Sequence, residues 1–373
     1  MKITILSTAY PYRGGISNFT GLLYKELIEN NNVEVITFKR QYPSIFFPGK
    51  SQIEKGESPA IIPTQQLVDS INPMNWFWVG RMIKRDAPDL LILTYFLPFF
   101  APCFGTISKI VKKNKKTKIL AICHNIIPHE KKFGDVSLTR LFLRTVDYFI
   151  VLSKKVQNDL INLKPNAKNI FLPHPVYSVF GETVDKKTAK EYLNINEEKI
   201  ILFFGFIRYY KGLDILFEAI SLLKEKINLK LIVAGEFYSN EEKYKSIIER
   251  LRIEDHLLLF TDFIPTPEVK YYFSACDVVI LPYRNATQSG IVQIAMNFEK
   301  PVIAANVGGL AEVVKNNKTG FIVEKENPEE LADAIFRFYS GNKEEEFIKN
   351  IENELEKYSW KRFVEGIMGL INS

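Results

Sequence analysis

The stretch that decides the fold spans residues 277–314 and reads DVVILPYRNATQSGIVQIAMNFEKPVIAANVGGLAEVV. Its apolar and polar blocks predict a buried strand, a glycine-ended loop, a helix behind Ser289 and Gly290, then a second strand, glycine loop and helix. Two strand-to-helix turns then lie next to each other at the carboxyl edge of one parallel sheet. Free backbone N–H groups and positive helix ends suit an anion, and two such turns together suit a diphosphate.

The same stretch resembles the C-terminal signature of the family 4 glycosyltransferases, which have the GT-B fold. The resemblance rests on a proline-ended strand, a KPVIA segment, a glycine pair and a following acid, which here are Pro282, residues 300–304, Gly308, Gly309 and Glu312. The family has two acidic residues whose places fall on Asn285 and Gln293 in this chain. Ser289-Gly290 resembles a variant of the family's glycine-rich loop.

Outward from this stretch, apolar runs alternate with amphipathic segments, which predicts two doubly wound parallel sheets of the α/β class. The resemblance implies two Rossmann-like domains that face each other across a cleft. We place an acceptor-binding domain at residues 1–180, a nucleotide-sugar-binding domain at 181–357, and a last helix at 358–373 that packs back on the first domain. Residues 40–72 are expected to be irregular. The apolar run 90–107 is interpreted as a strand and a loop instead of a membrane span, because two prolines interrupt it.

The composition is that of an ordinary globular protein, with 373 residues of which 46% are hydrophobic and 25% are charged. Three scattered cysteines, Cys103, Cys123 and Cys276, indicate a reducing compartment and give no framework for a metal. The first residues are too few and too polar for a secretory signal. We expect a cytoplasmic protein, with the inner face of the cell membrane as a peripheral location. It is expected to bind no cofactor, metal ion or nucleic acid.

The charge is distributed unevenly along the chain. Residues 1–180 hold 24 Lys and Arg against 12 Asp and Glu, whereas residues 181–373 hold 25 against 31. Chance and a solvated helix face would explain this imbalance, but we favour a first half that faces an anionic membrane or acceptor. The densest basic cluster is Lys109, Lys112, Lys113, Lys115, Lys116 and Lys118. Aromatic residues that would either insert shallowly or pack in the core are Trp76, Phe77, Trp78, Phe99 and Phe100.

The predicted donor site collects residues that follow strands, because ligands of doubly wound sheets bind beyond the carboxyl ends of strands. Arg208 and Lys211 lie on a short loop between Gly205 and Gly212, and a forked donor beside a point charge suits a phosphate. Two solvated surface charges are the alternative, which the glycines and the family resemblance disfavour. Glu312 equally suits a structural role at the start of a helix. The predicted donor-binding residues are Gly15, Gly205, Arg208, Lys211, Glu236, Phe263, Asn285, Ser289, Gly290, Gln293 and Glu312.

The predicted acceptor site lies in the first half of the chain. His124 ends an apolar strand, where a lone histidine is usually packed and hydrogen-bonded. Its counterpart in the family lies near the transferred sugar, so the resemblance implies that His124 binds a sugar hydroxyl group. The predicted acceptor-binding residues are Arg13, Gly14, His124, Asn125 and His129, and the predicted catalytic residues are His124, Arg208 and Lys211.

These features together predict a hexosyltransferase that uses a UDP- or GDP-sugar and a lipid-linked or other anionic glycan acceptor, as in polysaccharide biosynthesis. The resemblance implies retention of configuration by a same-face route, with protein charges on the leaving diphosphate in place of a metal ion. The amides of Asn285 and Gln293 bind hydroxyl groups but cannot act as a carboxylate nucleophile. Two alternatives remain: a nucleotide-sugar epimerase of GT-B fold, and a catalytically inactive nucleotide-binding partner protein.

Overall fold

The computed structural model describes residues 1–43, 52–53, 61–127, 133–238 and 241–372. The chain divides into two compact units. The first unit consists of Met1–Pro175 and Lys357–Ser373, and the second consists of Val176–Glu356. The sequence-based boundaries, 180/181 and 357/358, lie slightly C-terminal to these two crossings.

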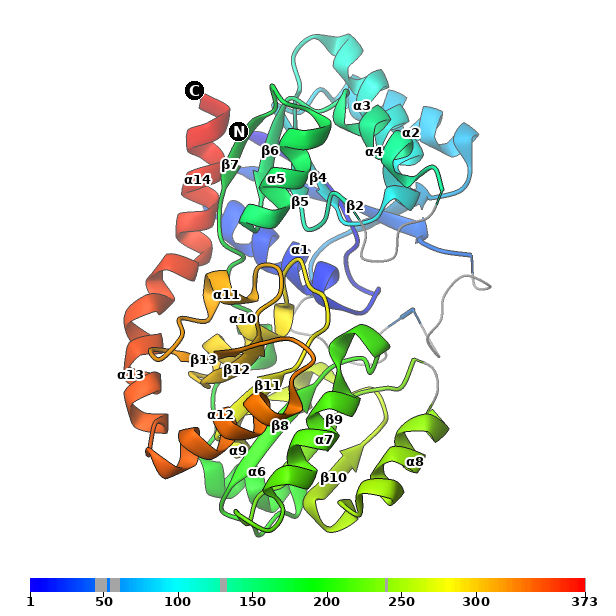
Figure 1. The fold of residues 1–373 in the computed structure, drawn as a ribbon. Coiled ribbons are helices and arrows are strands. Elements are labelled where there is room, and N and C mark those ends of the chain that lie inside the picture. The colour runs from blue at the N-terminus through cyan, green and yellow to red at the C-terminus, as the bar shows by residue number, and fades with distance from the viewer. Residues whose placement is uncertain (44–51, 54–60, 128–132, 239–240, 373) are drawn as a thin grey trace. The chain divides into compact units, whose positions relative to one another are not determined.

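The first unit is built on a seven-stranded sheet in which every neighbouring pair of strands is parallel (Figure 1). In spatial order its strands are β3 (Gln65–Asp69), β2 (Asn32–Arg40), β1 (Lys2–Leu6), β4 (Leu90–Tyr95), β5 (Lys118–Cys123), β6 (Tyr148–Val151) and β7 (Lys168–Phe171). The helices are α1 (Gly15–Leu27), α2 (Pro73–Asp86), α3 (Ala101–Val111), α4 (Asp135–Leu143), α5 (Lys154–Leu163) and α14 (Trp360–Asn372).

Helices α2, α3, α4 and α5 cover one face of this sheet, and their buried side chains form one hydrophobic core with the strands. Helix α14 contacts α1, β6 and β7, although it comes last in the chain. Lys118, at the start of β5, donates a hydrogen bond from Nζ to the carbonyl oxygen of Ile371 at 2.5 Å. The C-terminal helix is therefore an integral part of the first unit.

Two expectations for this unit are wrong. Residues 40–72 contain strand β3, whose sequence QQLVD has a single fully buried side chain, Val68, because the strand lies at the sheet edge. The segment after β4 is the helix α3 instead of a loop. Pro102 lies in the first turn of α3, where the missing proline N–H has no carbonyl partner to lose.

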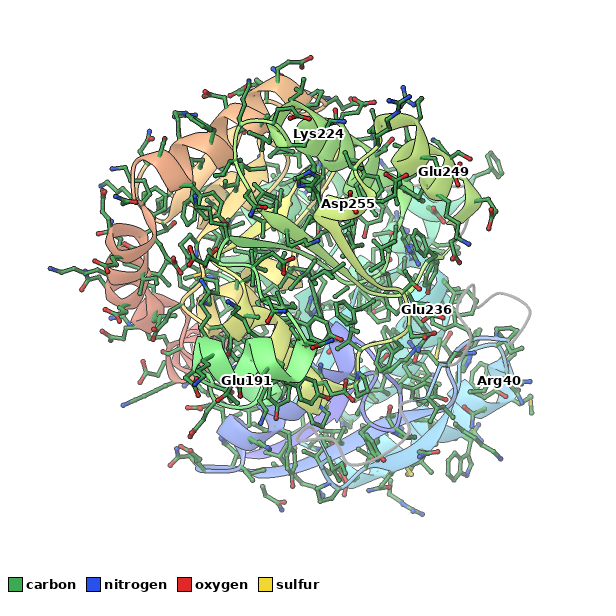
Figure 2. All side chains as sticks on the ribbon, turned by 90° about the horizontal axis from the view of Figure 1, so that it is seen from below. Arg40, Glu191, Lys224, Glu236, Glu249 and Asp255 are labelled. Atoms are coloured by element: carbon green, nitrogen blue, oxygen red, sulfur yellow. The ribbon has the colours of Figure 1, made fainter. Side chains whose placement is uncertain are left out.

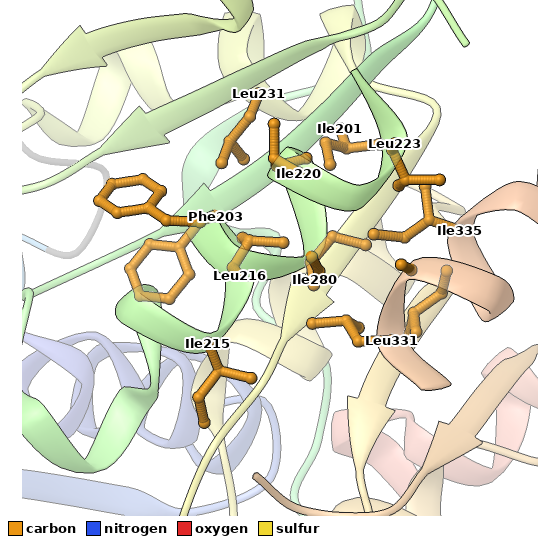
Figure 3. Close-up of a cluster of buried hydrophobic side chains, with 14 of the residues drawn as sticks. Ile201, Phe203, Ile215, Leu216, Ile220, Leu223, Leu231, Ile280, Leu331 and Ile335 are labelled. Atoms are coloured by element: carbon orange, nitrogen blue, oxygen red, sulfur yellow. The ribbon is translucent and has the colours of Figure 1, made fainter. Parts of the chain in front are cut away.

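The second unit has a six-stranded parallel sheet, in spatial order β10 (Leu257–Phe260), β9 (Lys230–Ala234), β8 (Ile200–Phe204), β11 (Val278–Leu281), β12 (Val302–Ala305) and β13 (Gly320–Val323). The helices are α6 (Lys186–Leu193), α7 (Leu213–Leu223), α8 (Glu241–Leu251), α9 (Val269–Ala275), α10 (Gly290–Asn297), α11 (Leu310–Val313), α12 (Pro328–Ser340) and α13 (Glu344–Leu355). Figure 3 shows the core, where Phe203 and Ile280 of the strands meet Leu216 of α7 and Ile335 of α12.

The prediction of two doubly wound, Rossmann-like parallel sheets is confirmed. In the second unit the strand order reverses between β8 and β11, and ligands of such sheets bind outside the strand ends at a reversal of this kind. A ligand site is therefore expected at the loops after β8 and β11. In the described part of the chain, no helix combines the length and apolar character needed to cross a membrane.

Candidate functional site

The loop after β8 brings Gly205 and Lys211 together. It ends in a single 3-10 turn, Tyr209–Lys211, which leads into α7. The side chain of Lys211 turns back toward the strand, so that a Cβ atom placed on Gly205 would lie 2.9 Å from Lys211 Nζ. Gly205 has φ +92°, a backbone conformation that other residues rarely adopt. This glycine therefore permits both the turn and the position of the lysine.

Lys211 is buried, with 7% of its surface exposed. Burial lowers its pKa to about 7, and the positive charge of Arg208 adds to the effect. The described residues offer its Nζ atom no carboxylate partner within ion-pair distance. A buried amine with nearby positive charge and no counterion gains stability when an anion binds.

Arg208 lies next to the end of β9. Its guanidinium carbon is 3.9 Å from the ring centroid of Tyr238. Two backbone hydrogen bonds fix the adjoining segments, since Ile207 N–H donates to the Glu236 carbonyl at 2.9 Å and Tyr238 N–H donates to the Ile207 carbonyl at 3.1 Å. Glu236, which is labelled in Figure 2, is 4% exposed. The structure therefore brings Arg208 and Glu236 into one small region.

The loop after β11 leads into α10 beside the same glycine. Ser289 caps this helix, because its Oγ accepts a hydrogen bond from the Ile291 N–H at 3.2 Å. The Ile291 side chain in the first turn approaches within 3.3 Å of the Cβ position on Gly205. The predicted donor residues Gly205, Lys211, Ser289 and Gly290 thus converge at the point where the strand order reverses.

The two amides at the places of the family's acidic residues differ in their surroundings. Asn285 is exposed on the loop after β11. Gln293 lies on α10 with 2% of its surface exposed, and its Oε1 has no hydrogen-bond partner among the described residues. Buried polar atoms are nearly always hydrogen-bonded, so an unpartnered amide oxygen here marks a place where a ligand donor would fit.

The glycine loop after β12 packs directly against the loop after β11. Gly309 N–H donates to the Thr287 carbonyl at 3.0 Å. Gly308 has φ +53°, and a Cβ atom at this position would lie 1.7 Å from the carbonyl oxygen of Ala286. Glu312 is half-buried in α11, and its backbone N–H donates to the Gly309 carbonyl at 3.2 Å. The two turns that the sequence placed side by side are therefore in direct contact.

Sequence reasoning missed the residue that connects the loops after β8 and β11. The Arg284 guanidinium donates to both carboxylate oxygens of Asp214, at 2.8 Å and 2.9 Å, and to the Tyr209 carbonyl at 2.9 Å. Its Nε also donates to Glu326 at 3.1 Å. The backbone N–H of Arg284 donates to the Tyr210 carbonyl at 2.7 Å. Nothing in the local sequence indicates that Arg284 and Asp214 meet.

Two predicted donor residues are not brought into this group. Phe263 is half-buried after β10, and the sheet order separates β10 from β11 by two strands. Gly15 begins α1 in the first unit, directly after Gly14, which has φ +111° at the N-cap. Their assignment to a donor site stays a prediction.

In the first unit, His124 follows β5 and is 4% exposed. Its backbone N–H donates to the Tyr95 carbonyl at 2.9 Å. Its ring meets the edge of Phe19 at 4.8 Å between centroids, and the ring of His174 lies 5.7 Å away. Burial, and secondarily His174, lowers the pKa of His124 well below its usual value. At neutral pH the ring is therefore uncharged and suited to hydrogen bonding.

The remaining predicted acceptor residues follow strands β1 and β5 in the chain. Arg13 is half-buried, and its backbone N–H donates to the Gln52 carbonyl at 3.0 Å. Asn125 is half-buried next to His124. His129 lies outside the described residues. Within the described ranges, no group of three or more His, Cys, Asp or Glu side chains is placed to hold a metal ion.

Residues 185–354 match the family model of glycosyl transferases group 1. The chain is 27% identical to an uncharacterised glycosyltransferase of Methanocaldococcus jannaschii, over 98% of this chain and 97% of that protein.

Two solved structures share the fold. Sucrose-phosphate synthase from Thermosynechococcus elongatus superposes with a TM-score of 0.76 at 17% identity, with 100% of this chain and 98% of that chain covered. HepE from Anabaena in complex with UDP-glucose superposes with a TM-score of 0.76 at 18% identity, with 99% of each chain covered.

Proposed function

We propose that the chain, whose residues 185–354 match the group 1 glycosyl transferases in agreement with the predicted resemblance, transfers a hexose from a nucleotide diphosphate sugar. The observation that carries this proposal is the buried amine of Lys211. It lies beside Gly205 and near Arg208, at the reversal of the strand order. A diphosphate supplies the negative charge that this position lacks.

In this proposal Arg208 and Lys211 bind the diphosphate and stabilise it as the leaving group. They act together with the N-terminus of α10. The Gln293 amide oxygen accepts a hydrogen bond from a donor hydroxyl group. The transfer retains the configuration by a same-face route, in which the departing phosphate accepts the proton of the incoming hydroxyl. Because positively charged side chains stabilise the leaving diphosphate, transfer is expected to persist in EDTA. If EDTA abolishes transfer and a divalent ion restores it, this assignment is contradicted.

The nucleotide is proposed to be UDP, with GDP as the second candidate. Support comes from HepE, which has the same fold and was solved with UDP-glucose. Titration calorimetry with UDP, GDP and ADP tests this choice. Arg208→Ala and Lys211→Ala should each weaken binding by about 1.5–3 kcal/mol, because each removes a charge-assisted contact. Circular dichroism checks that both variants fold, and unchanged nucleotide affinity in both would remove the diphosphate assignment.

We assign the acceptor to the first unit, through Arg13, Gly14, His124 and Asn125. The neutral ring of His124 suits a sugar hydroxyl group. The basic first half of the chain favours a lipid-linked or otherwise anionic glycan as acceptor, with the protein peripheral at the inner face of the cell membrane.

One assay distinguishes this function from its alternatives. The protein is incubated with a UDP-sugar, with and without a lipid-linked glycan. A transferase produces a new glycoside and UDP only when the acceptor is present. An epimerase changes the nucleotide sugar without an acceptor, and an inactive binding protein does neither while it still binds UDP.

A further inference from the structure

The outward side of α2 carries large apolar side chains that the fold leaves exposed. Met74, Phe77 and Trp78 are 78%, 49% and 54% exposed. They share their side of the helix with the exposed residues Arg81 and Arg85, because residues three, four, seven and eleven positions apart lie on one helix face. We call this stripe of Met74, Phe77, Trp78, Arg81 and Arg85 the α2 face.

The fold holds this helix firmly, so the exposed side chains are not the result of a loose segment. Asn72 caps α2 by accepting hydrogen bonds from two N–H groups of the first turn. Trp76 donates its indole N–H to the Asp69 carbonyl at 2.7 Å, on the inward side. Gly80 packs so closely on α3 that a Cβ atom would lie 3.1 Å from Ile110. Of the aromatic residues that the sequence singled out, Trp76 and the fully buried Phe100 are thus structural.

Most of the basic side chains around the α2 face have no ion-pair partner among the described residues, namely Arg81, Lys84, Arg85, Lys109, Lys113 and Lys115. The carboxylates of this region pair with other basic residues, as Asp69–Arg40, Asp86–Lys2, Asp89–Lys116 and Asp147–Lys112.

The lysine cluster lies at the C-terminal end of α2. Lys116 Nζ donates to the Ala87 carbonyl at 3.1 Å, and the Asn114 side chain donates to the Lys84 carbonyl at 3.5 Å. The basic end of the stripe therefore continues into the lysine cluster, in which Lys109, Lys113 and Lys115 form no ion pair with any described residue.

We propose that the α2 face docks on an anionic lipid bilayer, with Phe77 and Trp78 inserted at headgroup level and the basic residues against the lipid phosphates. Aromatic and basic side chains in one stripe are the combination that interfacial helices use, and an anionic bilayer is the partner whose charge complements this surface. This inference does not rest on the transferase activity. It concerns binding to vesicles, which is measured without nucleotide or acceptor.

The test is co-sedimentation with vesicles of phosphatidylcholine alone and of phosphatidylcholine with phosphatidylglycerol. The wild-type protein should sediment with the anionic vesicles at low salt, much less at high salt, and not with the neutral vesicles. Arg81→Glu, Lys84→Glu and Arg85→Glu together should lower the partition coefficient by about a hundredfold, since each basic side chain contributes about fivefold. The matched control reverses Lys226, Lys318 and Lys325, which are exposed in the second unit, and should sediment like the wild type.

Trp78 gives a second readout in the folded protein. Its fluorescence should shift to shorter wavelength with anionic vesicles, and Trp78→Phe should lose most of that shift while it still sediments. Phe77→Ser with Trp78→Ser should weaken sedimentation, whereas Phe336→Ser, at an exposed phenylalanine of α12, should not.

Two results would overturn the proposal. One is wild-type protein that stays in the supernatant with anionic vesicles at low salt. The other is a control triple variant that loses binding as much as the α2 variant, because binding would then follow net charge instead of this surface.

Discussion

Arg284 and Asp214 form a two-pronged ion pair, in which the two Nη atoms of the arginine lie 2.8 Å and 2.9 Å from the two carboxylate oxygens. Both side chains are 15% exposed. Asp214 is in the first turn of α7, and Arg284 is on the loop after β11. The pair therefore fixes the loop that carries Arg208 and Lys211 against the loop that leads to α10.

Arg284→Gln should reduce the free energy of unfolding by about 2–3 kcal/mol, because Asp214 keeps its charge and loses its partner. It should also weaken nucleotide binding, because Arg208 and Lys211 are no longer held in place. Chemical denaturation and calorimetry measure the two effects. Arg250→Gln is the control, since its exposed pair with Glu218 is 3.9 Å long and should contribute little. If Arg284→Gln changes stability and nucleotide affinity as little as this control, the Arg284–Asp214 ion pair does not hold the two loops together.

Nucleotide binding should take up a proton through Lys211. Its pKa is lowered to about 7 by burial and by Arg208, so the amine is largely neutral at about pH 8 in the free protein. A diphosphate stabilises the charged form and raises this pKa, so up to one proton is taken up at that pH. Calorimetry in two buffers that differ in ionisation enthalpy measures the uptake. Lys211→Met should abolish it, and equal heats in both buffers for the wild type would argue against the contact.

The lowered pKa of Lys211 also determines how the stability of the nucleotide-free protein changes with pH. The folded-state pKa of Lys211, about 7, is below the ordinary value of 10.5, so the unfolded chain binds more protons between these two values. The contribution of Lys211 to the free energy of unfolding should therefore rise as the pH increases from about 7 to 10.5. Comparison of the wild type with Lys211→Met isolates this contribution, and a fall over the same interval would contradict the assigned shift.

Gly308→Ala should destabilise the second unit by about 2–4 kcal/mol. The added methyl group would meet the Ala286 carbonyl, and the positive φ of Gly308 adds backbone strain. Gly369→Ala at an exposed position of α14, where the methyl group meets nothing within 4 Å, should instead stabilise by about 0.5–1 kcal/mol. Thermal unfolding of the two variants tests this. Equal shifts in the unfolding midpoint would mean that the contact between Gly308 and the Ala286 carbonyl does not require a glycine.

Gln293→Met should separate binding from stability. Methionine has nearly the shape of glutamine and removes a buried amide oxygen that has no partner, so the free energy of unfolding should rise by about 1 kcal/mol. Affinity for UDP-glucose should fall about tenfold, because the donor hydroxyl group loses its acceptor. A variant that loses stability instead would show that the amide serves the fold.

The architecture was predictable where the sequence signals are local. Ser289 and Gly290 predicted the start of α10, because a serine hydroxyl group caps a helix and a glycine without Cβ permits the preceding turn. Strand β3 was not predicted, because an edge strand buries few side chains. Helix α3 was not predicted, because its prolines were interpreted as helix breakers, although proline disrupts a helix in its interior and not in its first turn.

The site was predictable only in part, because the sequence records local signals and not contacts between distant segments. Arg208 and Lys211 share one short loop, so their proximity follows from the chain. The contact between Arg284 and Asp214 depends on the pairing of β8 with β11, which brings segments distant in the sequence together. The unpartnered oxygen of Gln293 is likewise a property of packing, which no pattern of residue types records.

The assignment of α14 to the first unit has a consequence for how the protein is made. The second unit is continuous, from Val176 to Glu356, and all of its residues are synthesised before α14. The first unit remains incomplete on the ribosome until α14 has emerged and Trp360 can reach Phe19. A premature stop codon just before residue 357 would therefore leave the continuous unit whole and damage the one that was begun first.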